Sequence, residues 1–86
     1  MTEVEKIKKI LKKYSVKEAY LFGSYRNNPQ KANDIDLAIS LGKINEFFKI
    51  SAALSMSMSK PLDLIYLNQK SKFNNMIKQQ GLKIYG

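Results

Sequence analysis

The chain has 86 residues, with fourteen Lys and one Arg against four Glu and three Asp, for a formal net charge of +8 at pH 7. It contains no Cys and no His, which excludes a disulfide framework, a thiol nucleophile, an imidazole base and a zinc site built from its usual ligands. Any catalysis must therefore use carboxylates, hydroxyls, Lys or a hard metal ion. The length predicts a single domain over residues 1–86 that holds both fold and function.

Composition also bears on the compartment and on the class of partner. No apolar run approaches the roughly 20 residues that span a bilayer, and residues 1–11 are charged and periodic, unlike a signal peptide. We therefore expect a cytoplasmic protein with no membrane association. The basic excess predicts a surface that attracts nucleic acid, nucleotides or acidic proteins, although an ordinary solvated surface also explains most of the lysines.

The first third of the chain predicts a helix, a buried strand and a loop. Thr2 and Glu5 form a capping box, and apolar residues then recur at helical spacing as far as Tyr14. Residues 18–22 are a short apolar run that ends at Gly23-Ser24, which is typical of a strand followed by a turn. Residues 25–33 are polar and predict a surface loop that could begin with a helical turn.

The remainder predicts two further β-α units. Residues 34–41 alternate strictly between polar and apolar side chains, and we expect a strand there. A helix over residues 44–58 stops before a proline, and residues 62–67 form a second β-prone run. Ser71 then caps a short helix that ends near Gly81, before a last strand over residues 82–85. We predict the α+β (α/β) class, with a small mixed β-sheet and helices packed on one face.

For four large apolar residues of the second predicted helix, over residues 44–58, the sequence leaves the environment open. Phe47, Phe48, Met56 and Met58 could belong to the core or to an interface, and the sequence favours the core.

The three aspartates all fall in predicted strands. Asp34 and Asp36 stand two positions apart, so their side chains point to one face with about 6.5–7 Å between α-carbons. A structural alternative is that Asp34 ends the loop and Asp36 lies at an exposed edge. Asp63 lies in another apolar strand, where burying its carboxylate without a partner would destabilise the fold by several kcal/mol. The alternative is that Asp63 faces water from an edge strand. If the two strands are neighbours, the three carboxylates gather and their repulsion calls for a divalent metal.

Gly23-Ser24 directly after a strand is compatible with phosphate binding, because Gly allows close approach and the Ser hydroxyl can donate, although such a pair is more often a simple turn. Gly23-Ser24, Asp34-x-Asp36 and Asp63 together resemble the minimal nucleotidyltransferases (MNT-type) of the polymerase-beta-like superfamily. The resemblance covers nearly the whole chain and implies the polymerase-beta-like nucleotidyltransferase fold.

By this resemblance, Gly23 and Ser24 bind the phosphates of ATP, and Asp34 and Asp36 bind two Mg²⁺ ions. Asp63 completes the metal site and helps to deprotonate the attacking hydroxyl. The chain departs from the family pattern in the loop, which is one residue shorter and has Asn27 in place of the usual Gly. Arg26, the only Arg, is a candidate phosphate ligand whose reach depends on that shortened loop.

Minimal members of the family are similar in organisation to antitoxins paired with HEPN proteins. The resemblance implies a hetero-oligomer in which the chain transfers AMP from ATP to a hydroxyl of a HEPN-type partner, that of a tyrosine. The alternative is a catalytically weak nucleotide-binding module that neutralises the partner by direct binding. A third class, a basic nucleic-acid-binding domain, is supported by charge alone and lacks an aromatic stacking motif.

Overall fold

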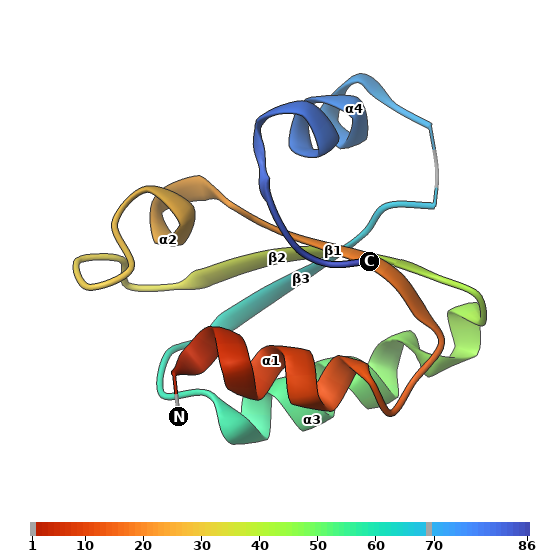
Figure 1. Cartoon of the computed structure of the whole chain (residues 1–86), viewed down its shortest axis with the longest axis horizontal. Coiled ribbons are helices and arrows are strands. Elements are labelled where there is room, and N and C mark those ends of the chain that lie inside the picture. Colours follow the sequence, from red (N-terminus) through yellow and green to blue (C-terminus); the bar gives the residue numbers. More distant parts are fainter. Residues whose placement is uncertain (1, 69) are drawn as a thin grey trace.

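Four strands make one mixed sheet in the order β3-β2-β1-β4 in the computed structural model, which describes residues 2–68 and 70–86 (Figure 1). Strand β1 pairs antiparallel with both β2 and β4, and β2 pairs parallel with β3. This confirms the predicted mixed sheet. The strands are β1 Val16–Phe22, β2 Ile35–Leu41, β3 Leu62–Tyr66 and β4 Leu82–Tyr85.

Helices follow the predicted order, with one additional short element. The helices are α1 Glu3–Leu11, α2 Gly23–Asn27, α3 Phe47–Ser57 and α4 Lys72–Gln80, with a 3-10 turn at Ile44–Glu46 before α3. Both predicted caps are confirmed, because Thr2 Oγ1 accepts from the backbone N–H of Glu5 at 3.1 Å and Ser71 Oγ accepts from that of Asn74 at 3.0 Å. The helical turn at the start of the predicted loop is α2. Within the described residues, no helix combines the length and apolarity needed to cross a bilayer.

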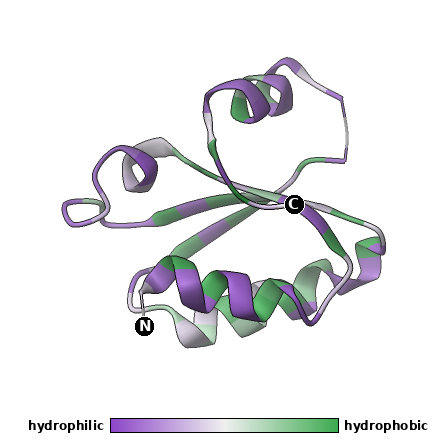
Figure 2. Cartoon of the chain, viewed as in Figure 1, coloured by the Kyte–Doolittle hydropathy of each residue, from purple (hydrophilic) through white to green (hydrophobic). Residues whose placement is uncertain are grey.

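The sheet separates two apolar clusters. The larger lies between the sheet and the layer formed by α1 and α3, and its fully buried members include Ile7, Leu11, Ile35, Leu37, Ile39, Ile50 and Leu54. The smaller lies on the other face, beneath α4, and contains Tyr20, Ala38, Leu67 and Ile77. Figure 2 shows hydrophobic residues along the strands and α3, while α1 alternates between hydrophobic and hydrophilic residues. The predicted fold class is confirmed, and α4 covers part of the second face in addition.

Three local predictions need correction. Phe48 and Met56 are 81% and 87% exposed, because α3 turns Ile50 and Leu54 toward the core and these two residues away from it. Phe47 and Met58 do pack against the core, as predicted.

One boundary also differs from the sequence expectation. Strand β2 begins at Ile35, so Asp34 directly precedes the strand instead of lying in it. The end of α4 lies where predicted, because Gly81 follows its last residue, with φ −71°. A Cβ there would lie 2.5 Å from the carbonyl oxygen of Ile77 and 3.1 Å from that of Leu21, so a side chain at this position would crowd the backbone of both α4 and β1.

Candidate active site

The aspartates lie at the end of the sheet where β1 ends and β2 and β3 begin. Parallel pairing of β2 with β3 sets Asp36 beside Asp63, and antiparallel pairing of β1 with β2 sets Phe22 beside Asp36 on the other side. Because directly paired residues point to the same face, Phe22, Asp36 and Asp63 form a row across three strands. The row is on the face that carries α4, since Ala38 and Tyr20, two positions along, pack in the smaller cluster.

These carboxylates interact electrostatically. Burial, followed by the nearby charge of Asp63 and then of Asp34, raises the pKa of Asp36 above its ordinary value. Asp36 is half-buried, whereas Asp34 and Asp63 are exposed. Of the two alternatives for Asp63, the structure has the exposed one, because β3 is an edge strand. Proximity to Asp36, rather than burial, distinguishes Asp63.

Gly23 brings the turn after β1 into contact with this row. It has φ +70°, and a Cβ built on it would overlap Oδ2 of Asp36 and lie 3.3 Å from the Cγ of that side chain. Ser24 follows at an exposed position, and Tyr25 is buried in the larger cluster, where it anchors α2. The structure thus brings together Gly23 and Asp36, which the sequence only suggested were parts of one site.

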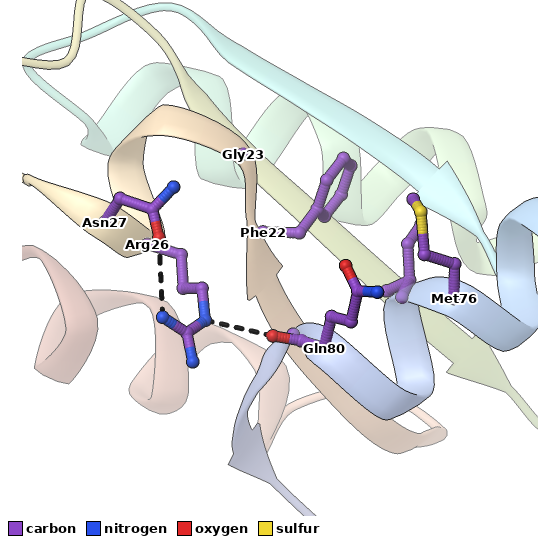
Figure 3. A pocket seen from close by; sticks show the side chains of 8 residues that line it. Phe22, Gly23, Arg26, Asn27, Met76 and Gln80 are labelled. Carbon is purple, nitrogen blue, oxygen red and sulfur yellow. Dashed lines mark hydrogen bonds between the residues drawn. The ribbon is translucent and has the colours of Figure 1, made fainter.

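Arg26 connects α2 with the end of α4. Its Nε donates to the backbone oxygen of Gln80 at 3.0 Å, and its Nη1 donates to Oδ1 of Asn27 at 3.4 Å (Figure 3). The guanidinium is therefore held on the side of the Gly23 turn that faces α4.

A hollow of about 480 Å³ opens between α2 and α4, next to the carboxylate row. Its lining consists of Phe22, Gly23, Arg26, Asn27, Met76, Ile77, Gln80 and Gly81. Sequence reasoning missed Phe22 and the α4 residues. The helical spacing of Met76, Ile77 and Gln80 predicts one face of a helix, but no local signal says that this face meets β1 and α2.

The donor set fits magnesium in its chemistry. Mg²⁺ prefers carboxylate oxygens, and a cation would offset both the burial and the repulsion from Asp63 and Asp34 that raise the pKa of Asp36. Over residues 2–68 and 70–86, no three acidic side chains are gathered closely enough to form a metal cluster by themselves. Asp36 and its neighbour Asp63 are the best-placed pair, with Asp34 two residues before Asp36.

Comparisons with known proteins point in the same direction. The family model "Polymerase beta, Nucleotidyltransferase" matches residues 5–86. No curated protein matches the chain. A toxin-antitoxin crystal structure with AMP-PNP is 26% identical, with a TM-score of 0.79 over 99% of this chain and 74% of that chain.

Two further solved structures are similar. A mutant of the toxin-antitoxin MntA-HpeT is 26% identical, with a TM-score of 0.78 over 100% of this chain and 73% of that chain. A complex of tri-AMPylated HEPN toxin from Shewanella oneidensis with MNT antitoxin is 24% identical, with a TM-score of 0.73 over 98% of this chain and 70% of that chain. At that identity the last likeness supports the fold alone.

Proposed function

Because the chain belongs to the polymerase beta nucleotidyltransferase family, we propose that it transfers AMP from ATP to a hydroxyl, preferably of tyrosine, on a HEPN-type partner protein. The observation that carries the proposal is the contact of the Gly23 turn with Asp36, which is itself paired with Asp63. Phosphate-binding backbone and metal-binding carboxylates must lie this close for transfer of a nucleotidyl group. We propose residues 1–86 as one nucleotidyltransferase domain.

The chain's residues have separate tasks in this reaction. Gly23 and Ser24 bind the phosphates of ATP, with Arg26 beside them. Asp34, Asp36 and Asp63 would hold Mg²⁺, which when bound neutralises phosphate charge and favours ionisation of the attacking hydroxyl. Asp63 is exposed on an edge strand, where a hydroxyl of another protein can reach it.

The transfer itself is a substitution at phosphorus. The acceptor oxygen forms a bond to the α-phosphorus, and the bond from that phosphorus to the oxygen bridging to the β-phosphate breaks. Pyrophosphate leaves, and Asp63 takes the hydroxyl proton as general base. The acceptor thus gains AMP, and the proton and the pyrophosphate account for the remaining atoms.

Partner binding in a hetero-oligomer is the second part of the proposal. It is supported by the similarity to toxin-antitoxin complexes and by the net charge of +8, which favours an acidic partner. The activity and the partner are tested together. The chain is incubated with labelled ATP, Mg²⁺ and the HEPN-type product of an adjacent gene, and the partner's intact mass is measured.

We expect the mass of one or more AMP groups on the partner. Asp36→Ala should abolish the transfer, while Glu5→Gln, which removes an exposed carboxylate on α1, should leave it unchanged. If Asp36→Ala still modifies and neutralises the partner, the proposed mechanism is wrong.

One observation favours a second candidate, a nucleotide-binding module that neutralises its partner without turnover. Arg26, the candidate phosphate ligand, is already held by the carbonyl of Gln80. A module of this kind gives a tight complex with the partner and no change in the partner's mass.

A further inference from the structure

The hollow between α2 and α4 has two chemically different ends (Figure 3). Gly23, Arg26 and Asn27 form the α2 end. Phe22 and Met76 supply apolar surface at the other end, where the Gln80 side chain extends from the last turn of α4 toward Phe22. The eight lining residues, all within the described chain, include one cation and no carboxylate. An anionic ligand with an apolar, hydrogen-bonding part matches both ends.

From this arrangement we infer that the α4 wall, made by Met76 and Gln80 together with Phe22, is the subsite for the nucleobase of the nucleotide donor. The inference rests on the proposed function, because it places the base of the same ATP whose phosphates lie along Gly23. The base packs against Phe22 and Met76. The amide of Gln80, which offers both a donor and an acceptor, bonds to its polar edge.

The order of the strands supports a donor rather than an acceptor in this hollow. In the row across the sheet, Asp63 on β3 comes first, then Asp36 on β2 and then Phe22 on β1. The hollow lies at the Phe22 end of this row, on the side of Asp36 away from Asp63. If Asp63 takes the proton, the acceptor hydroxyl approaches from the β3 side. In-line displacement then places the leaving pyrophosphate on the β1 side, along Gly23 at the α2 end of the hollow, and this leaves the α4 end for the base of the same donor.

The size and composition of the hollow agree with this assignment. Its volume of about 480 Å³ falls within the usual range for small-molecule sites, about 300–1,000 Å³. Met76 is 41% exposed even though it forms a wall, so the apolar surface is open to a ligand. The backbone oxygen of Gln80 accepts a hydrogen bond from Nε of Arg26, which links the end of α4 to α2 across the hollow.

The test compares ATP with inorganic tripolyphosphate, which carries the phosphates but no nucleoside. Binding of each to the full chain with Mg²⁺ is measured by calorimetry for the wild type, Gln80→Leu and Met76→Ala. Gln79→Leu is the control for the first variant, because Gln79 is the neighbouring exposed amide and does not line the hollow. Met56→Ala, on α3, is the control for the second. Thermal unfolding verifies that each variant is folded.

We expect Gln80→Leu to weaken ATP binding by about 2- to 10-fold, the effect of one net hydrogen bond, and Met76→Ala to weaken it by a similar factor. Both variants should bind tripolyphosphate as the wild type does, and the two controls should bind both ligands normally. The wild type should bind ATP more tightly than tripolyphosphate.

Other results overturn the inference in distinguishable ways. If ATP and tripolyphosphate bind the wild type equally and no variant changes this, the base lies elsewhere, while the transferase proposal stands. If Gln80→Leu keeps ATP affinity but loses AMP transfer, the hollow takes the acceptor instead. If the wild type binds neither ligand, the proposed function fails and the inference fails with it.

Discussion

Replacing Gly23 with alanine should separate a backbone effect from a contact with the carboxylates. The residue has φ +70°, a conformation that costs an L side chain about 1–2 kcal/mol. The new methyl group would also overlap Oδ2 of Asp36. Because a carboxylate can rotate on its side chain, we expect the overlap to displace the Asp36 oxygens more than it unfolds the chain. The result is a loss of about 1–2 kcal/mol in unfolding free energy and a larger relative loss of Mg²⁺-dependent ATP binding.

Urea denaturation of the wild type, Gly23→Ala, Asp36→Ala and the double variant measures the contact. Asp36→Ala removes the overlapping oxygen, so Gly23→Ala should cost less in that background, with a difference above about 0.5 kcal/mol, the limit within which independent sites add. Gly42→Ala is the control, because its φ is not positive and its nearest neighbour would be 3.5 Å from the Cβ. Equal costs in both backgrounds would refute the contact, and no cost in either would refute the strained backbone.

Three further predictions concern the stability of the metal-free protein. Because the pKa of Asp36 is raised, the folded state binds more protons than the unfolded state between the ordinary pKa of 3.8 and the folded value, so stability falls as pH rises through that window. Asp36→Asn should therefore raise the melting temperature at pH 7 and have no such effect below pH 3.8, and a lower melting temperature at pH 7 would contradict this. Leu54→Ala should destabilise the fold by about 2–5 kcal/mol in urea denaturation, and Met56→Ala by less than about 0.5 kcal/mol, since Leu54 is buried and Met56 is 87% exposed; similar values would refute the assigned helix face. Ser71→Ala should cost about 1 kcal/mol through the lost cap of α4, and an unchanged urea midpoint would show that the cap contributes nothing.

Local signals in the sequence predict most of the secondary structure. Caps at Thr2 and Ser71 locate the starts of α1 and α4, because each hydroxyl satisfies a backbone N–H that the helix leaves unpaired. The alternation of polar and apolar side chains correctly locates β2. It also predicts that the polar side of the strand faces water, whereas Ala38 and Ser40 on that side are buried. Burial of that side depends on α4, which lies more than thirty residues later in the chain, and periodicity within a strand carries no information about it.

The site is predictable only in part for a related reason. Residue type and spacing single out Gly23, Asp34, Asp36 and Asp63, since carboxylates are rare in strands. Their juxtaposition depends on the parallel pairing of β2 with β3 and on its register, which places Asp36 beside Asp63. A slip of one residue would turn one carboxylate to the opposite face. The α4 residues that line the hollow are still harder to predict from the sequence, because their position depends on how a helix packs over a strand.

Position in the fold also separates the roles of the basic and acidic residues. Lys6, Lys9 and Lys13 line a hollow of about 310 Å³ between the end of α1 and the end of α3, in the helical layer on the face of the sheet opposite α4. The carboxylate row lies on the α4 side. These lysines are therefore separated by the sheet from the proposed phosphate site at Gly23, and under that proposal they would act on ATP only through a long-range potential that salt screens over about 8–10 Å. Arg26 is the basic residue that lines the hollow beside Gly23. Salt should consequently slow the encounter with polyanions more than it weakens the contacts of a bound nucleotide.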